Sequence, residues 1–168
     1  TFYGDDNYAD KTVDANFTVS LYIINGTYTD LQNKIDNAVG GVFDLPYDFA
    51  YLPGYDDVNN PNFINGVMLN KTLTINGNGH IISGNNSARI FNITAEVTLR
   101  DITFINGSAV DGAAIYNTAD LLNFTNCKFH NNYASSRGGV IFLKNSETID
   151  TEIYFYSPFF FNNTADGS

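Results

Sequence analysis

The chain has 168 residues, a length that suits one folded domain with a single core. Its 43% hydrophobic and 15% aromatic content is enough apolar surface to offset chain entropy, which excludes a disordered polymer. Eighteen acidic residues against eight basic ones give a net charge of −10, so nucleic acids and anionic lipid surfaces are excluded as partners.

Residues 1–28 are expected to form an N-terminal extension. The start, Thr1 to Asp10, is polar and lacks the basic region of a signal peptide, and no apolar run in the chain is long enough to span a membrane. The segment from residue 17 to residue 23 alternates apolar and polar side chains, which predicts a strand with one buried face. Its apolar residues are Phe17, Val19, Leu21 and Ile23.

Residues 29–41 are expected to form a short helix that covers one end of the fold. Thr29 to Gln32 has the form of a capping box, Leu31, Ile35, Ala38 and Val39 then share one helical face, and Gly40-Gly41 is a stop signal. A first strand with Val42, Phe43 and Leu45 follows. The stretch from Pro46 to Phe63 is rich in Tyr, Asp, Asn and Pro, which predicts a long loop.

Residues 42–168 contain a repeat of about 25 residues. Three sets of apolar residues recur in step, at an offset of 25 and then of 31 residues, and the six extra residues predict a loop at Lys144 to Asp150. The three sets are Val97, Leu122 and Ile153; Leu99, Phe124 and Phe155; and Phe104, Phe129 and Phe160. A further column is expected through Val67, Ile90, Ile115 and Ile141.

The repeat predicts an all-β fold, a right-handed parallel β-helix with three short strands per coil. The strands alternate with period two and lack hairpin turns, so successive repeats pair in parallel and equivalent side chains stack. Cys127, the single cysteine, is then a small buried hydrophobe. Asn106, Asn131 and Asn162 recur two residues after the stacked phenylalanines. They form either an asparagine ladder at a turn or exposed turn residues in the left-handed region.

Three segments carry a resemblance to a known family. They are Leu73 to Gly84 (LTINGNGHIISG), Phe104-Ile-Asn-Gly with Gly112-Ala-Ala-Ile-Tyr116, and Phe129-His-Asn-Asn-Tyr-Ala with Gly138-Gly-Val-Ile-Phe142. Over about residues 29–168 the chain resembles the adhesin-like surface proteins of methanogenic archaea, whose coils share features with bacterial polymorphic outer-membrane proteins. The resemblance implies an extracellular, cell-surface β-helix whose role is adhesive or structural. Its expected partners are surface glycans or proteins.

An enzymatic function is the alternative, because β-helices also include pectate lyases and polygalacturonases. Such enzymes need paired carboxylates, or carboxylates that bind Ca²⁺ beside a basic residue. Arg89, Arg100 and Arg137 are scattered, and Asp101, Asp111 and Asp120 follow no strand column. We therefore expect a non-enzyme, with a fragment of a carbohydrate-active enzyme as the alternative.

Metal and cofactor sites are not expected. Asp56-Asp57 is predicted to be a solvated turn, His80 belongs to a Gly-x-Gly-His turn, and His130 has no second ligand at zinc spacing. The segments Asp5 to Asn7 and Asp56 to Asn60 have oxygen ligands for Ca²⁺ but not the spacing of an EF-hand.

The sequence also predicts two surface features. Eight N-x-S/T sequons occur, and those predicted to be accessible to N-glycosylation are Asn16, Asn25, Asn70, Asn85 and Asn123. If Ile90, Ile115 and Ile141 face inward, then Phe91, Tyr116 and Phe142 face outward as an aromatic stripe. This stripe either binds sugars or proteins, or is covered by another segment.

Self-association is the last expectation. A β-helix that ends without a cap exposes unpaired backbone groups, which are a template for another strand. The alternating residues Phe17, Val19, Leu21 and Ile23 either supply that strand to a neighbouring molecule, which gives a head-to-tail filament, or fold back on their own chain.

Overall fold

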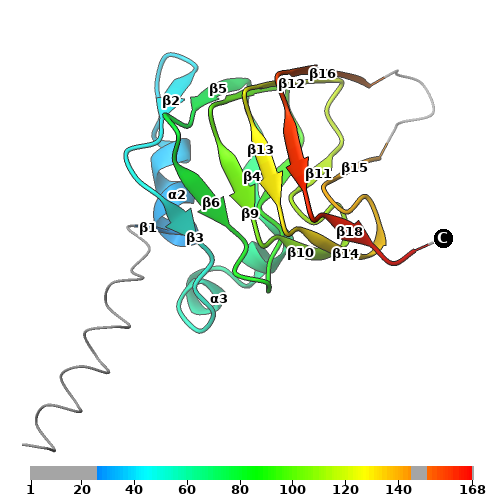
Figure 1. Cartoon of the computed structure of the whole chain (residues 1–168). Coiled ribbons are helices and arrows are strands. Elements are labelled where there is room, and N and C mark those ends of the chain that lie inside the picture. Colours follow the sequence, from blue (N-terminus) through cyan, green and yellow to red (C-terminus); the bar gives the residue numbers. More distant parts are fainter. Residues whose placement is uncertain (1–25, 145–150, 168) are drawn as a thin grey trace, which may run out of the picture.

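The computed structural model describes residues 26–144 and 151–167 of the chain (Figure 1). The fold is mainly β, as expected, and the described strands form four sheets that contain only parallel pairs. Short helices lie at the end where the described chain begins. Except for the short strand β1 (Gly26–Thr27), neighbouring strands in a sheet come from successive repeats of the sequence, so each sheet takes one strand per repeat.

The four sheets are named here A to D. Sheet A consists of β1, β3 (Phe49–Ala50), β6 (Ile81–Ser83), β9 (Thr103–Ile105), β13 (Lys128–His130) and β17 (Phe159–Phe161). Sheet B consists of β2 (Val42–Asp44), β5 (Leu73–Asn76), β8 (Val97–Arg100), β12 (Leu121–Thr125) and β16 (Glu152–Tyr156). Sheet C consists of β4 (Val67–Leu69), β7 (Phe91–Ile93), β11 (Ile115–Asn117) and β15 (Ile141–Leu143). Sheet D consists of β10 (Ser108–Asp111), β14 (Tyr133–Arg137) and β18 (Thr164–Ala165).

Sheet D is a fourth strand position that the prediction of three strands per repeat missed. Its strands bury few side chains, and only Ala134 of β14 is fully buried. A strand with one buried residue has no apolar alternation to reveal it.

The three predicted apolar columns are confirmed by the strand register. Val97 pairs with Leu122 and Leu122 with Ile153, while Leu99 pairs with Phe124 and Phe124 with Phe155. The rings of Phe104 and Phe129 stack at 5.0 Å, and those of Phe129 and Phe160 also at 5.0 Å. Parallel pairing at about 4.8 Å places equivalent side chains directly over one another, so the rings form a continuous interior stack.

The column predicted through Ile90 is wrong by one residue. Phe91 pairs with both Val67 and Ile115, and its side chain is fully buried. Ile90 is buried too, at the position that precedes the strand, where Ala114 and Val140 lie in the next repeats. Ile90 and Phe91 are both buried, so apolar character alone does not show which of them lies in the strand.

The asparagines at 106, 131 and 162 occupy one turn in three repeats. All three are left-handed, with φ of 53°, 53° and 50°, and the Asn162 amide donates to Oδ1 of Asn131 at 2.8 Å. The side chains of Asn131 and Asn162 are exposed. Both alternatives therefore hold in part, since these are exposed turn residues with one amide-to-amide contact between them.

The buried amide ladder lies one residue later, at Asn132 and Asn163. Asn132 is 1% exposed, accepts from the Gly107 N–H at 2.9 Å, and donates to the Phe104 carbonyl and to Asn163 Oδ1. Asn163 in turn donates to the Phe129 carbonyl at 2.9 Å. Gly107 holds the same position one repeat earlier, where a Cβ would lie 2.8 Å from Asn132 Oδ1. These amides satisfy backbone groups that the turn leaves unpaired.

The predicted helix is present as α2 (Tyr28–Asp36), but it begins earlier and ends earlier than expected. Its N-cap is Thr27, whose side chain accepts from the Asp30 N–H at 3.2 Å, so the predicted capping box at Thr29 is not the cap. Its buried residues Tyr28, Leu31 and Ile35 join the core, whereas Val39 is exposed.

Gln32 of α2 covers the edge of sheet C. Its side-chain amide donates to the Met68 carbonyl at 3.1 Å, and its side-chain oxygen accepts from the Met68 N–H at 2.8 Å. The amide thus takes the place of a neighbouring strand beside β4, the first strand of this sheet. An exposed edge would otherwise present unpaired backbone groups.

The segment predicted as a long loop is structured. It contains β3, the short helix α3 (Asp56–Asn59) and the 3-10 helix η1 (Pro61–Asn65). The rings of Tyr51 and Phe63 lie 5.5 Å and 6.3 Å from that of Tyr28, which fixes α2 to this segment.

The interior phenylalanine stack supplies a test of the register. Phe129→Ala should lower the free energy of unfolding by about 3–5 kcal/mol, because it opens a cavity between two stacked rings. Urea unfolding measures the change. Phe161→Ala is the matched control, because Phe161 lies on the adjacent strand of sheet A and is 58% exposed. A loss below about 1 kcal/mol at Phe129 would contradict the register.

Candidate ligand-binding groove

The outward side of sheet C carries one side chain from each of its strands. The register aligns Met68, Asn92, Tyr116 and Phe142 in this order. The rings of Tyr116 and Phe142 lie 5.4 Å apart. Two of the three predicted stripe residues are therefore neighbours on this face, but the assignment of Phe91 is wrong, because Phe91 faces the core and Asn92 takes its place.

Arg89 lies beneath this row and is only 8% exposed. Its guanidinium donates to three backbone carbonyls, those of Gly112 (3.0 Å), Asn65 (3.0 Å) and Asp111 (2.8 Å), and lies 4.9 Å from the Tyr116 ring centre. Burial lowers the pKa of Arg89 from its ordinary value. No carboxylate of the described residues forms an ion pair with Arg89, so its charge is met by backbone carbonyls and by the face of the Tyr116 ring.

The nearest acidic residue, Asp111, is engaged by a second arginine. Arg137 donates to the two carboxylate oxygens of Asp111 at 3.0 Å and 2.9 Å, and its guanidinium lies 4.5 Å from the Phe142 ring centre. The hydrogen bond from Arg137 lowers the pKa of Asp111, which therefore stays ionised. The face thus carries two arginine–aromatic pairs on neighbouring strands.

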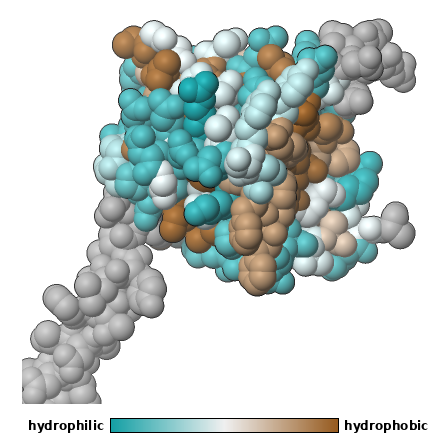
Figure 2. Space-filling view, turned by 45° about the horizontal axis from the view of Figure 1, so that its top comes forward, coloured by the Kyte–Doolittle hydropathy of each residue, from teal (hydrophilic) through white to brown (hydrophobic). Residues whose placement is uncertain are grey.

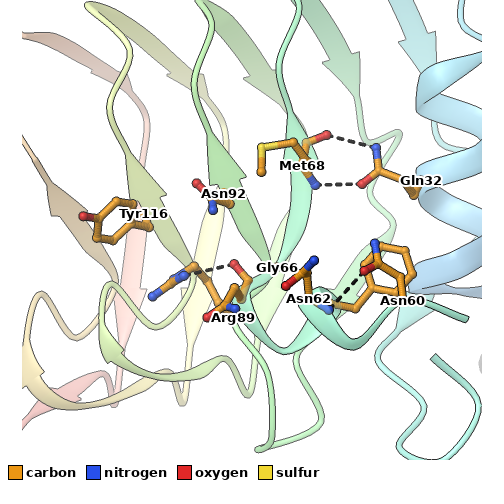
Figure 3. A pocket seen from close by; sticks show the side chains of 10 residues that line it. Gln32, Asn60, Asn62, Gly66, Met68, Arg89, Asn92 and Tyr116 are labelled. Atoms are coloured by element: carbon orange, nitrogen blue, oxygen red, sulfur yellow. Dashed lines mark hydrogen bonds between the residues drawn. The ribbon is translucent and has the colours of Figure 1, made fainter. Parts of the chain in front are cut away.

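A groove of about 510 Å³ opens beside this row (Figure 3). Figure 3 shows Met68, Asn92 and Tyr116 on three neighbouring strands, Arg89 below them, and the Gln32 amide bound to the Met68 backbone on the far side. The remaining lining residues are Asn60, Asn62, Phe63, Asn65 and Gly66. The lining contains four asparagines, a glutamine and one arginine but no acidic residue, although the chain has a net charge of −10.

Sequence reasoning missed Arg89 and Asn92 as groove residues. Arg89 stands in the otherwise apolar run Ala88 to Phe91, and an isolated charge among buried residues is a sign of a paired or functional side chain. Asn92 was hidden by the error of one residue at Phe91.

Asp56 is fully buried, which corrects its assignment to a solvated turn. Its carboxylate accepts from the Tyr28 and Thr29 N–H groups, the Thr29 hydroxyl and the Leu52 N–H, at 2.7 to 3.2 Å. Three of these four donors belong to the first two residues of α2, so the carboxylate anchors the start of the helix to the segment that contains Leu52. Both carboxylate oxygens already accept hydrogen bonds, which opposes their use as calcium ligands.

Two tyrosines beside Asp56 and Asp57 have raised pKa values. Burial and then the nearby Asp56 charge raise the pKa of Tyr28 well above its ordinary value. Burial and the hydrogen bond to Asp57 raise the pKa of Tyr51 to about 12. Asp57 itself is exposed, as predicted, but it lies in helix α3 and not in a turn.

The two histidines occupy different surroundings. His80 pairs through Nδ1 with Asp48 at 3.0 Å, and the same Asp48 oxygen accepts from the Ile81 N–H, so this pair fixes the turn before β6. His130 lies against the ring of Phe159, 5.3 Å away, on the outward side of sheet A. Cys127 is buried as predicted, and burial raises its pKa to about 11. Among residues 26–144 and 151–167, no three His, Cys, Asp or Glu side chains gather as a metal site.

The predicted glycosylation sites differ in accessibility. Asn70 and Asn85 are exposed and Asn123 is half-buried, while Asn16 and Asn25 lie outside the described residues. Their modification stays a prediction, which peptide mapping of native material checks. The segment Asp5 to Asn7, one of the two with oxygen ligands for Ca²⁺, also lies outside the described residues.

The side of the molecule that carries the C-terminal strands is rich in exposed aromatic residues. Figure 2 shows an apolar band on this half of the surface. Strands β16 and β17 contribute Phe155 (38% exposed), Phe160 (47%), Tyr154, Tyr156, Phe159 and Phe161. The candidates for strand donation, Phe17, Val19, Leu21 and Ile23, lie outside the described residues.

The buried carboxylate supplies a second test. Asp56→Ala should lower the free energy of unfolding by about 3–5 kcal/mol, because several buried donors lose their acceptor at about 1–3 kcal/mol each. Thermal or urea unfolding measures the loss. Asp57→Ala is the matched control, and we expect a much smaller loss because Asp57 is exposed. Equal losses in the two variants would contradict the anchoring role of Asp56.

Comparisons with known proteins assign no function to this groove. No protein-family model, curated protein or solved structure matches the chain. No helix of the described residues is both long and apolar enough to cross a membrane.

Proposed function

We propose that the chain is an extracellular, cell-surface adhesive or structural module built on a right-handed parallel β-helix, and that the outward face of sheet C binds its ligand. The proposal includes a relation to the adhesin-like archaeal surface proteins that the repeat motifs resemble. In this function the repeated surface acts by binding, without a catalytic centre.

Three features of the fold support the β-helix part of the proposal. Each of the four sheets takes one strand per repeat, the strands pair in register, and equivalent interior side chains stack. These are the properties of a solenoid in which each coil contacts its neighbours. The helix α2 and Gln32 would then cover the first coil.

The observation that carries the adhesive part is the row of Tyr116 and Phe142 beside the groove. Each ring lies against an arginine, and the groove next to Tyr116 is lined by amides. Aromatic rings that present apolar area beside fixed hydrogen-bonding groups are typical of sites that bind sugars and proteins.

Retention on cell envelopes tests this function. Beads that carry the chain should bind isolated envelopes of the organism that makes it, and Tyr116→Ala should lower retention roughly tenfold, because central aromatic residues contribute most of the binding energy of an interface. Tyr154→Ala is the control, because Tyr154 is a 43% exposed tyrosine on sheet B. Equal retention of the two variants, or no retention of the parent chain, would contradict the proposal.

Head-to-tail self-association is a second candidate function, and the exposed aromatic residues of β16 and β17 favour it. The strand donated to this end would be the segment with Phe17, Val19, Leu21 and Ile23. The side chains of Phe155 and Phe160 would supply apolar contacts, and the strand edges would supply backbone pairing.

Deletion of residues 1–25 tests self-association and leaves the Thr27 cap and the buried Tyr28 in place. Light scattering should show that the parent chain forms polymers and that the deletion variant is a monomer of equal stability. Leu21→Asp in the full chain should have the same effect, because a charge in an apolar pocket opposes strand addition. A monomeric parent chain would overturn this candidate.

A further inference from the structure

The row on sheet C has a gap at its second position. Met68, Asn92 and Tyr116 occur in register on three successive strands, so the outer two are separated by two strand spacings, roughly 10 Å. Asn92 is the shortest of the three side chains, and no hydrogen bond of the described residues engages its amide. Figure 3 shows it between the two longer side chains.

The width of this gap suits one ring. Atoms in van der Waals contact lie about 3.5–4.0 Å apart, so a ring held between two flanking groups needs about 7–8 Å. One side of the gap is formed by the Tyr116 ring together with the Arg89 guanidinium, which lies 4.9 Å from the ring centre, and the other side is formed by Met68. The Phe142 ring lies 5.4 Å from that of Tyr116, on the next strand. A pyranose ring has the flat apolar faces that such walls accept.

The base of the gap is positively charged. Arg89 donates to three carbonyls, and a guanidinium has five N–H groups, so two of them remain for a ligand. Arg89 is only 8% exposed, and its three hydrogen bonds hold the guanidinium in place. The carboxylate of Asp111, the acidic residue nearby, is hydrogen-bonded to Arg137 and not to Arg89.

We propose that this gap is a binding slot for an acidic sugar residue of the uronic acid class, whose ring lies between Met68 and Tyr116 and whose carboxylate faces Arg89. The proposal rests on the adhesive function above and names its ligand class. Carboxylate and guanidinium groups have matching hydrogen-bond geometry, and a fixed arginine needs no ordering on binding. The Asn92 amide and the nearby Asn62 are the polar groups for the sugar hydroxyls.

The net charge of the molecule limits the choice of ligand further. A net charge of −10 repels a dense polyanion, whereas the groove lining has one positive and no negative residue. Isolated acidic residues in an otherwise neutral polysaccharide satisfy both conditions.

Titration with paired sugars tests the slot. The full chain is titrated with methyl glucuronoside and with its neutral match, methyl glucoside, and amide shifts of the described strands are followed by NMR. We expect the acidic sugar to bind at least about tenfold more tightly, with a loss of this preference at high salt. Equal affinity for the two sugars, or shifts outside sheet C, would overturn the proposal.

Matched substitutions place the binding in the slot. Asn92→Asp puts a carboxylate between Met68 and Tyr116 and should weaken binding of the acidic sugar about tenfold or more, because like charges meet there. Asn123→Asp makes the same change at a half-buried position on sheet B and should leave affinity unchanged. Equal effects of the two variants would overturn the proposal. Arg89→Lys keeps the positive charge but removes the paired N–H donors of the guanidinium, and it should lower the preference for the acidic sugar. Circular dichroism that matches the parent shows that this variant is folded.

The experiments distinguish a failure of the acidic-sugar slot from a failure of the adhesive function. If Asn92→Asp loses the acidic sugar but is still retained on cell envelopes, the slot exists but is not the adhesive contact, which overturns its link to the proposed function. If neither sugar binds while the parent chain is retained on envelopes, the ligand class is wrong and the adhesive function stands.

Discussion

In-register pairing between successive repeats is the constraint on which the rest of this structure depends. A strand in sheets A to D finds its backbone partners in the strands one repeat earlier and one repeat later. The same pairing forces like side chains into columns, so an interior position filled by phenylalanine is best followed by another ring, as at Phe104, Phe129 and Phe160. Short strands need sharp turns between them, and left-handed asparagines supply these turns at small steric cost.

The same constraint makes the two ends of the sheets chemically different. At the first strand of sheet C, the Gln32 amide imitates a strand, and the buried Asp56 carboxylate fixes the helix that carries Gln32. At the other end, interior-facing rings such as Phe155 and Phe160 are partly exposed. The buried charge of Asp56 thus serves the edge of sheet C, because it holds the helix whose Gln32 covers that edge.

The sequence predicted the sheet columns well, because side chains that stack in register must be alike and their recurrence is visible. It failed where two apolar residues adjoin, at Ile90 and Phe91, since burial alone does not say which of them lies in the strand. It also failed for Asp56 and Asn132, whose burial depends on donors from distant segments that no local pattern indicates. The groove at Arg89 was invisible for the same reason, because its three carbonyl partners come from residues 65, 111 and 112.

The anchoring of α2 by Asp56 has a consequence for folding kinetics. Asp56 ties the start of the helix to residues that follow it by fewer than thirty positions, and each later repeat pairs with the one just before it. Such contacts have modest sequence separation, so loop-closure entropy is small at every step. We therefore expect nucleation at the helical end and growth by whole repeats, a process in which a partly folded molecule always presents one advancing apolar edge.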